Sequence, residues 1–319
     1  MNNILPWSEQ TEALFKVDLT KDFSYDVSQI NATVICDSIN KVNNKRLVTL
    51  QLTYPRYILS EVNTHRILSK NSSSSRACPA SKIRNNIRNG MFAPVYWGAN
   101  QRGMSANTQL TGWRKTLAKG LWKTNGYINT GFHYLLEHLG VHKQICNRIV
   151  EPWVVTHTVI TGTEWDNFFQ LRYNKSAQPE FIILAKCIHD AIKASSPRVL
   201  ENNEPHLPYI TNEDRVNHNV VDCIKVSVAR CCRVSYKSND SNTLSEFSKD
   251  VALFDRLFKD HHMSPFEHVG FVCNQGRITK DLHHELQRNF RGWYQFRGFI
   301  EPITNVKYLN KFYNIDLNV

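Results

Sequence analysis

The stretch Leu47-Val-Thr-Leu-Gln-Leu-Thr-Tyr54 alternates apolar and polar side chains from its second residue onward. Val48, Leu50, Leu52 and Tyr54 fall on one side of an extended chain, and Thr49, Gln51 and Thr53 fall on the other. Alternation with a period of two, closed by Pro55, predicts a half-buried strand. Residues 56–68 then predict a helix that ends in a serine-rich loop.

Helical patterns recur further along the chain. Residues 113–139 predict a long helix with basic residues in its first half. Ala177-Gln-Pro-Glu180 predicts the beginning of another helix, since Pro179 suits a first turn and Glu180 complements the helix dipole there. The apolar face of that helix comprises Phe181, Leu184, Ile188 and Ala191.

A third helix is expected at Thr243, where Thr-x-x-Glu resembles a capping box. Its expected buried residues are Leu244, Phe247, Val251, Phe254 and Phe258. Residues 84–112 predict an irregular excursion, and residues 195–220 a surface connection. Because strands and helices mix without regular alternation, the sequence predicts an α+β fold. We expect one catalytic domain over residues 1–319, with a core at about 31–300.

Composition excludes several classes of protein. The chain has 319 residues, of which 41% are apolar and 21% charged, which excludes disordered chains, collagen and coiled coils. The longest apolar stretch, residues 153–162, is too short to span a bilayer, and the first residues do not resemble a secretory signal. The 8 cysteines form no C-x-x-C pair, so we expect reduced thiols in a cytoplasmic protein and no zinc site.

The positive charge is concentrated in one part of the chain. The formal net charge is +11, and residues 61–150 hold 13 basic residues against two acidic ones, which accounts for all of it. A charge excess confined to one stretch predicts an anionic partner, either a nucleic acid or the phosphates of small molecules.

The densest polar cluster is Thr64-His-Arg-Ile-Leu-Ser-Lys-Asn-Ser-Ser-Ser-Ser-Arg76. Hydroxyls, backbone N–H groups and guanidinium groups in this pattern could surround a phosphate. A flexible polar loop is the alternative. Neither a P-loop motif nor a strand-borne G-x-G-x-x-G is present, so a nucleotide site of those kinds is not supported.

Three further segments could carry chemistry. In residues 164–172, Trp165, Phe168 and Phe169 form an apolar wall beside Arg172, which could stack on a planar ligand or be an ordinary exposed arginine. Residues 261–268 contain three histidines and a glutamate, but their spacing matches no common metal motif. Residues 289–297 mix aromatics with arginines and could stack on a base or cofactor ring, or belong to the core.

Taken together, these motifs resemble those of the flavin-dependent thymidylate synthases. That family has an Arg-His-Arg triplet, a following Ser-x-Arg, a helix that ends in Asn-Phe-x-x-Leu-Arg, an Ala-Arg-x-Ser element and His-x-[ST]-Pro-[FL]-Glu-His. The matching segments here are Thr64-His65-Arg66, Ser74-Ser75-Arg76, Arg148-Ile-Val150, Asn167-Phe-Phe-Gln-Leu-Arg172, Ala177-Gln178, Arg233-Val-Ser235 and His262-Met-Ser264-Pro-Phe-Glu-His268. The last element follows the triplet here instead of preceding it, so the motif order resembles a circular permutation, as in virus-encoded members.

The resemblance implies an antiparallel or mixed sheet flanked by helices, and reductive methylation of dUMP at C5. Methylenetetrahydrofolate would supply the carbon, FAD would relay a hydride and NADPH would reduce the flavin. Arg172 would be catalytic and would stabilise an electron-rich uracil. The flavin residues implied are His65, Arg66, Thr161, Asn167, Ser235, His262 and Ser264, and the nucleotide residues are Glu61, Ser72, Ser74, Ser75, Arg76, Arg148 and Arg172. The family also implies a homotetramer, in the host cytoplasm if the chain is virus-encoded.

Departures from the family pattern keep alternatives open. Thr64 replaces the first arginine of the triplet, Ser72 replaces a glutamate, Glu61 a glutamine and Thr161 an asparagine. The loss of a cation and the shift of a carboxylate could change the pyrimidine, to dCMP, or the product, to a hydroxymethyl group. A basic nucleic-acid-binding protein remains the competing interpretation from a different class.

Overall fold

The computed structural model describes residues 28–202, 204–234, 245–273 and 279–317. Its larger sheet has the strand order β3-β4-β2-β1-β5, and its smaller sheet has the order β6-β7-β8. The strands are β1 (Asn31–Asn40), β2 (Arg46–Pro55), β3 (Ser69–Ser72), β4 (Val155–Gly162), β5 (Arg198–Leu200), β6 (Pro205–His206), β7 (Gly270–Val272) and β8 (Trp293–Gln295). Only β1 and β5 pair in parallel, so the larger sheet is mixed. The predicted α+β fold with a mixed sheet and flanking helices is confirmed.

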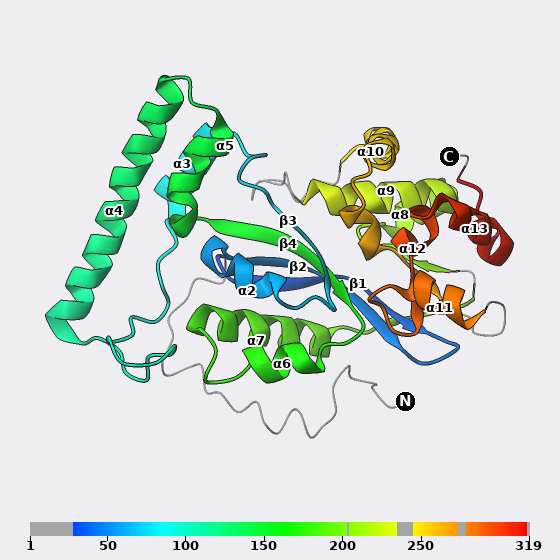
Figure 1. Ribbon diagram of the computed structural model, residues 1–319, viewed down its shortest axis with the longest axis horizontal. Helices are drawn as coiled ribbons and strands as arrows, with labels where there is room; N and C mark the ends of the chain where they lie inside the picture. Colours follow the sequence, from blue (N-terminus) through cyan, green and yellow to red (C-terminus); the bar gives the residue numbers. More distant parts are fainter. Residues whose placement is uncertain (1–27, 203, 235–244, 274–278, 318–319) are drawn as a thin grey trace.

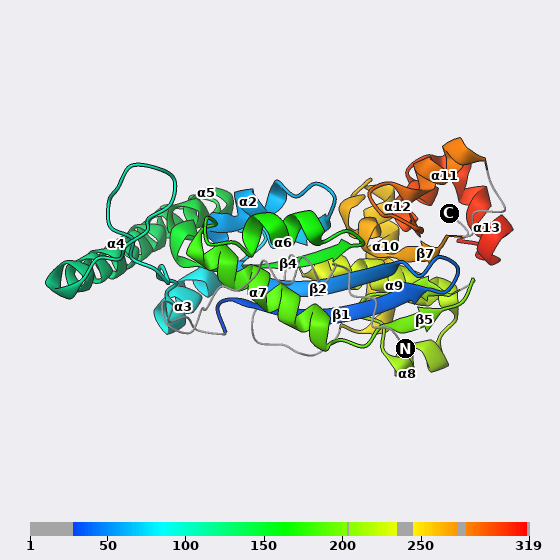
Figure 2. The ribbon, with the colours of Figure 1, turned by 90° about the horizontal axis from the view of Figure 1, so that it is seen from below.

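Helices cover the sheet and extend the molecule at both ends (Figures 1 and 2). They are η1 (Arg56–Ile58), α2 (Leu59–Asn63), α3 (Ala80–Gly90), α4 (Gly112–His138), α5 (Lys143–Cys146), η2 (Asn147–Trp153), α6 (Asp166–Arg172), α7 (Pro179–Ala194), α8 (Asn212–Asn217), α9 (Val220–Arg233), α10 (Phe247–Lys259), η3 (Ser264–His268), α11 (Lys280–Gln287), α12 (Phe296–Ile300), η5 (Ile303–Asn305) and α13 (Val306–Tyr313). The long helix α4 forms one end, and α11 and α13 lie at the other.

The central strand β2 is buried on both faces, so the expectation of a half-buried strand is wrong. Its apolar face packs on α6 and α7, through residues such as Leu50 and Phe181. Its polar face is also covered, because the Thr49 hydroxyl bonds at 2.8 Å to both Thr161 Oγ1 and His206 Nε2. Buried hydroxyls require such partners. The alternating pattern of side chains therefore predicted the strand correctly, but it did not predict the second layer that covers the polar face of β2.

The two longest predicted helices are confirmed, as α4 and α7. In α7, Pro179 occupies the first turn and Phe181, Leu184 and Ile188 are buried, as expected. Glu180 does more than complement the dipole, because its buried carboxylate accepts a hydrogen bond of 3.0 Å from the Val95 amide. The carboxylate thereby anchors the segment between α3 and α4.

Other boundaries differ from the expectations. The helix predicted over 56–68 ends at Asn63, where the Thr64 hydroxyl turns back to the Glu61 carbonyl. Helix α3 continues to Gly90, so only the later part of the 84–112 excursion is irregular. The 195–220 connection contains β5, β6 and α8, since Pro205 and His206 pair with β7.

The third predicted helix begins later than expected. Thr243 and Leu244 lie outside the described residues, and α10 begins at Phe247 with Glu246 as its N-cap. Phe254 is buried as expected, whereas the other three described members of the expected buried set are only partly buried. The packing of α10 on α9 therefore buries fewer of these side chains than the sequence pattern predicted.

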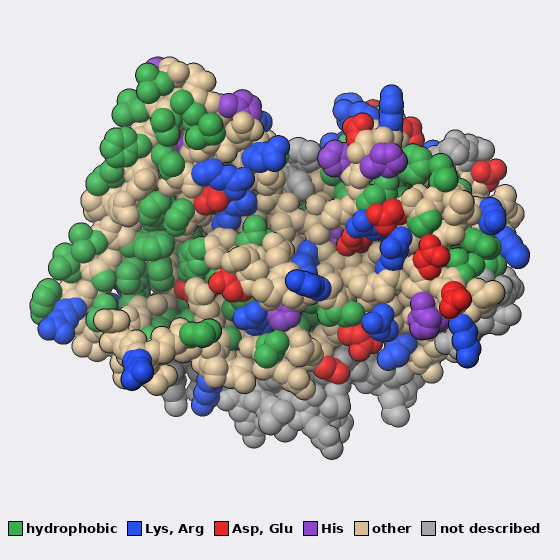
Figure 3. Space-filling view, in the orientation of Figure 1, with side chains coloured by type: hydrophobic (Ala, Val, Ile, Leu, Met, Phe, Trp, Pro, Cys, Tyr) green, Lys and Arg blue, Asp and Glu red, His purple; other side chains and the backbone are tan. Residues whose placement is uncertain are grey.

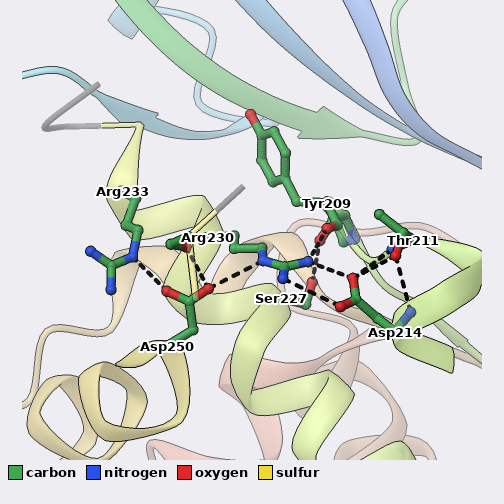
Figure 4. A network of polar contacts seen from close by, with 9 residues as sticks. Tyr209, Thr211, Asp214, Ser227, Arg230, Arg233 and Asp250 are labelled. Atoms are coloured by element: carbon green, nitrogen blue, oxygen red, sulfur yellow. Dashed lines mark hydrogen bonds and ion pairs between the residues drawn. The ribbon is translucent and has the colours of Figure 1, made fainter. Parts of the chain in front are cut away.

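A buried ion-pair network joins α8, α9 and α10 (Figure 4). Arg230 donates from Nη1 to Asp214 Oδ2 at 2.6 Å and from Nε to Asp250 Oδ2 at 3.2 Å. Arg233 donates from Nε to the other oxygen of Asp250 at 2.5 Å. The side chain of Asp250 is fully buried and forms ion pairs with both of these cations. The network fixes the end of α9, directly before Ser235.

None of the described helices is both long enough and apolar enough to cross a membrane.

Candidate active site

Segments from four parts of the sequence meet along the edge strand β3. The Ser264 hydroxyl donates to the Lys70 carbonyl at 3.3 Å, and the Asn71 amide donates to the Cys231 carbonyl at 2.9 Å. Arg172 reaches the residues directly before β3. Figure 3 shows a notch between the α4 end and the α9–α10 end, with Lys and Arg side chains along its rim. Three of the motifs singled out in the sequence are therefore neighbours in space.

Arg172 lies at the C-terminal end of α6, where the apolar side chains of that helix hold its backbone in place. Its Nε donates to His65 Nε2 at 2.8 Å, and its Nη2 donates to Thr64 Oγ1 at 3.2 Å. The guanidinium also lies over the Phe181 ring, 4.6 Å from its centroid. Stacking and two hydrogen bonds restrict a side chain that has five N–H donors, of which these contacts use two. The remaining donors can serve a ligand.

His65 accepts from Arg172 and is therefore neutral, with its proton on Nδ1. Burial, reinforced by the positive charges of Arg172 and Lys70, lowers its pKa to about 4. The ring packs edge-on against Phe168, with centroids 5.0 Å apart. His65 is thus a fixed hydrogen-bond acceptor for Arg172 across the neutral pH range.

Lys70 supports the same corner from within β3. Its ammonium donates to the carbonyls of His65 and Leu68. Burial lowers its pKa to about 8, against the opposing effect of Glu267. Lys70 belongs to the polar cluster at 64–76 that could surround a phosphate, but its ammonium donates to the turn before β3.

The serine run forms the end of β3 and a tight turn after it. Ser72 Oγ accepts from Thr158 at 2.8 Å, so this side chain is engaged within the sheet. Ser73 Oγ bonds to Thr156 Oγ1 at 2.8 Å. In the turn, the carbonyl of Ser75 accepts from Asn147 at 2.6 Å, which ties the turn to η2. The loop is held by these bonds and is not a free linker.

The Ser75 hydroxyl is an exception to this pattern. It is buried, and it has no hydrogen-bond partner in the described part of the chain. Buried hydroxyls without partners are uncommon, and each calls for an unseen ligand or water. Ser74 is partly exposed and Arg76 exposed on the same turn. This donor set fits an anionic, phosphate-bearing ligand.

Further basic side chains lie beside the turn. Arg56 donates from Nη1 to the Ser73 carbonyl at 2.9 Å, and its Nε lies 2.9 Å from Glu151 Oε1. Arg148, which is half exposed, lies at the same distance from that carboxylate oxygen. Lys143 donates to the Ala77 carbonyl at 3.3 Å. The sequence predicted Arg148 at this site but gave no role to Arg56. Arg56 begins a predicted helix, and no local pattern shows that it lies near Ser73 and Glu151.

Thr161 lies on the other side of the sheet from Arg172. Thr161 belongs to β4 and pairs with Ser69 of β3, and its hydroxyl bonds to Thr49 Oγ1 and to His268 Nδ1, each at 2.8 Å. Burial lowers the pKa of His206 and of His268 to about 3, so both rings are neutral. Thr161 thus belongs to an interior polar chain and, in this single chain, does not join the cluster around His65.

Most of the remaining expected site residues have side chains that reach solvent in the single chain. Arg66, Asn167 and His262 are exposed. Glu61 is partly exposed, and its carboxylate accepts from the Ser60 hydroxyl at 2.8 Å. Ser235 lies outside the described residues.

The segment 289–297 supports β3 through its amides. Asn289 Nδ2 donates to Ser69 Oγ at 2.9 Å, and Gln295 Nε2 donates to the same oxygen at 3.1 Å. The aromatic residues Phe290, Trp293, Tyr294 and Phe296 are buried. The interpretation of this segment as a stacking surface is therefore wrong, and the alternative of a core segment is confirmed.

The described residues contain no group of three or more His, Cys, Asp or Glu side chains arranged to hold a metal ion. The 8 cysteines are free thiols, and five of them are buried.

Comparisons with known proteins give limited overlap. No family model matches the chain, and no curated protein matches it. Among solved structures, the chain is similar to a UMP/dUMP methylase, PolB, from Streptomyces cacaoi bound with 5-Br UMP, with 14% identity, a TM-score of 0.40 and coverage of 54% of this chain and 96% of that chain. A structure of PolB bound with 5-Br dUMP gives 16% identity, a TM-score of 0.37 and coverage of 49% and 75%. At these scores the interpretation of the site depends on its own contacts.

Proposed function

We propose that this protein binds FAD and a pyrimidine deoxynucleotide, dUMP, and methylates the pyrimidine at C5. Methylenetetrahydrofolate would be the carbon donor and NADPH the reductant. The observation that carries the proposal is the hydrogen bond from Arg172 Nε to His65 Nε2. It joins two of the segments on which the resemblance to flavin-dependent thymidylate synthases depends, although they lie about a hundred residues apart.

Arg172 would act on the electronics of the uracil ring. Withdrawal of the imide proton moves electron density onto C5, and a guanidinium beside the ring oxygens stabilises the resulting negative charge. Because His65 and Phe181 hold the arginine, little reorganisation would be needed when that charge develops. When bound, the flavin would supply the hydride. No cysteine nucleophile is required, in keeping with Cys36 and Cys232, whose pKa burial raises to about 11.

The nucleotide phosphate would lie at the turn after β3. Support comes from the buried Ser75 hydroxyl without a partner and from the exposed Arg76 beside it. Arg148 would join them, since its carboxylate partner Glu151 is shared with Arg56 and can remain neutralised by that residue. A phosphate at this turn would accept bidentate hydrogen bonds from Arg148 in place of the ion pair between Arg148 and Glu151.

The flavin would be held by Arg66, Asn167, His262 and Ser264, of which the first three are exposed in a single chain. Such exposure suits a site completed by a second subunit. We therefore include a homotetramer in the proposal, with each site lined by more than one chain.

One feature favours a second candidate reaction, C5 hydroxymethylation of dUMP or dCMP. Thr64 stands where the family has an arginine, and its hydroxyl accepts from Arg172. One cation is therefore absent, and the remaining arginine is held by a neutral group. A change of this kind next to the pyrimidine could alter which base is accepted and how the one-carbon unit is released.

The deciding experiment offers dUMP and dCMP separately to the purified full chain, with FAD, methylenetetrahydrofolate and NADPH. A flavin absorption spectrum and mass spectrometry of the nucleotide product are recorded. Methylated dUMP supports the leading proposal, and a hydroxymethyl product selects the second candidate. Colourless protein that converts neither nucleotide and binds DNA in a salt-sensitive manner overturns both, in favour of a nucleic-acid-binding protein.

A further inference from the structure

The outer face of α4 exposes an unusual amount of apolar surface. More than half of the large apolar side chains that are exposed in the described part of the chain lie on α4 or on its C-cap. Trp113 is 71% exposed and Leu139 80% exposed, at the two ends of the helix. Figure 3 shows apolar side chains gathered along the α4 end of the molecule. We define the outer stripe as Leu117, Leu121, Ile128, Phe132, Leu135 and Leu139.

The outer stripe follows helical geometry. Its members recur at intervals of three, four or seven residues, so they remain on one side of the helix. The opposite side is packed on the rest of the chain, where Gly126, Thr130 and His133 are buried. A Cβ at Gly126 would come within 2.6 Å of Met91 and 2.9 Å of Trp153. The helix is therefore held on one face and cannot rotate to hide the other.

Beyond the first turn of α4, where the exposed Arg114 lies three positions before Leu117, no Lys, Arg, Asp or Glu of the helix shares the side of the outer stripe. Lys115, Lys119 and Lys123 recur every four residues, two positions out of step with Leu117 and Leu121, and so lie on another side of the helix. From residue 124 to residue 136 the helix has no Lys, Arg, Asp or Glu. Depletion of charge with enrichment of aromatic and aliphatic groups is typical of the centre of a protein interface.

The size of the surface also suits an interface. The helix has 27 residues, which corresponds to about 40 Å of length. At roughly 100 Å² for each large exposed side chain, the six members of the outer stripe offer about 600 Å², and the nine exposed apolar side chains of α4 and its C-cap about 900 Å², against 300–600 Å² for the largest patch on an ordinary monomer. Stable interfaces bury about 800 Å² on each partner.

The order of large and small residues along this face is complementary to its own reverse. If a second α4 runs antiparallel along the outer stripe, with the two-fold axis at the level of residue 126, residues whose numbers add to 252 lie at the same height. Large residues then meet small ones at the inner positions. These inner pairs are Gly120 with Phe132, Leu121 with Gly131, and Thr124 with Ile128, while Leu117 meets Leu135 further out. A two-fold interface requires such self-complementarity.

The two glycines of this pattern have no role within a single chain. A Cβ at Gly120 or at Gly131 would meet nothing within 4 Å. Glycine inside a helix costs about 1 kcal/mol relative to alanine. Close approach by the Phe132 and Leu121 side chains of a second copy would explain the absence of a side chain at both positions.

We propose that α4 is a self-association surface, where two copies of this chain pair as antiparallel helices through the outer stripe. A membrane surface is the other kind of partner for a basic amphipathic helix. It is disfavoured because residues 124–136 of α4 contain no Lys or Arg that could meet anionic headgroups, and because the large-small order would have no purpose there. The pairing would form one two-fold contact of the proposed tetramer, but it does not depend on the proposed reaction.

The test measures the mass of the purified full chain, without ligands, by light scattering after size-exclusion chromatography. Leu121→Glu with Ile128→Glu should at least halve the mass of the assembly, with an unchanged circular dichroism spectrum. Lys119→Glu, a charge change on α4 outside the stripe, should leave the mass unaltered. Equal masses for the double variant and the wild type would overturn the proposal.

A second pair of variants tests the register. Gly131→Leu should weaken association at least tenfold, because the new side chain would collide with Leu121 of the second copy. Addition of Leu121→Ala should restore association by making room for it. Failure of this rescue overturns the antiparallel register. A wild-type chain that is monomeric at every concentration, and that sediments with phosphatidylserine vesicles, overturns self-association in favour of a membrane surface.

Discussion

Arg172 donates from its Nε to Nε2 of His65 over 2.8 Å. The contact places the cation at the end of α6 beside the residues that lead into β3. It also fixes the direction of the guanidinium, because His65 is neutral and can only accept at this nitrogen. A side chain that is restrained but only partly buried can present its other donors to a ligand.

The role proposed for Arg172 leads to the first prediction. Arg172→Ala should lower kcat for C5 modification of dUMP at least 100-fold, because one preformed donor to a developing negative charge is worth about that factor. FAD should still bind, as measured by quenching of flavin fluorescence. Lys175→Ala is the control, since Lys175 is exposed three positions further on. Unchanged turnover in Arg172→Ala would reject the assigned role.

Arg76 provides a prediction about binding. Arg76→Ala should raise the dissociation constant of dUMP about tenfold or more, through loss of a charge-assisted contact to the phosphate. At saturating nucleotide, kcat should change little. Calorimetric titration of the flavin-loaded protein measures the constant, with Arg88→Ala, an exposed arginine of α3, as the control. An unaltered constant would move the phosphate contact to another residue.

The sequence predicted the individual helices and strands better than the contacts between them. The strand at 47–54 and the helices that became α4 and α7 were recognisable because their periodicity is local. The layer over the polar face of β2 was not recognisable from the sequence, because it depends on His206, which is far along the chain. Likewise, the bond from Asn289 to Ser69 spans 220 positions, and no local pattern encodes such a pair.

The candidate site shows the same limit. The motif spacing identified Arg172 and His65 separately, and the structure joins them. Thr161 was grouped with them by its place in the sequence, but adjacent residues of a strand point to opposite faces. Thr161 therefore lies with His268, whereas Ile160 lies on the side of α6 and α7.

The buried histidines predict a pH dependence of stability. The pKa of His65 is lowered to about 4, and those of His206 and His268 to about 3, from the ordinary value of about 6.5. The unfolded chain therefore binds more protons below pH 6.5. Stability is fully present above that pH and is lost as the pH falls towards the folded-state values, by up to about 1.4 kcal/mol per unit for each histidine.

A single variant isolates one of these contributions. His206→Gln should reduce the slope of unfolding free energy against pH by about 1 kcal/mol per unit between pH 6 and pH 5. Urea unfolding at several pH values measures the slope. His261→Gln, which changes an exposed histidine, should leave it as in the wild type. Equal slopes for His206→Gln and the wild type would contradict the expectation.

Asp250 is the residue whose loss should destabilise the α8–α10 network most (Figure 4). Its side chain is fully buried, and it receives hydrogen bonds from Arg230, Arg233 and Ser245. Asp250→Asn would remove the negative charge and leave the buried Arg230 with Asp214 as its remaining carboxylate partner. We expect the free energy of unfolding to fall by about 3–5 kcal/mol, the usual cost of breaking a buried ion pair from one side.

Urea unfolding compares this variant with Asp255→Asn on the same helix. Asp255 lies 3.8 Å from Lys225, and its side chain is 59% exposed, so its loss should cost less than about 1 kcal/mol. If both variants lose the same small amount, the network does not hold α9 and α10 together. If only Asp250→Asn is destabilised, Arg233 should also become mobile, and with it the end of α9 that leads to Ser235. The flavin affinity of Asp250→Asn, measured under conditions where it is folded, should then fall, whereas that of Asp255→Asn should not.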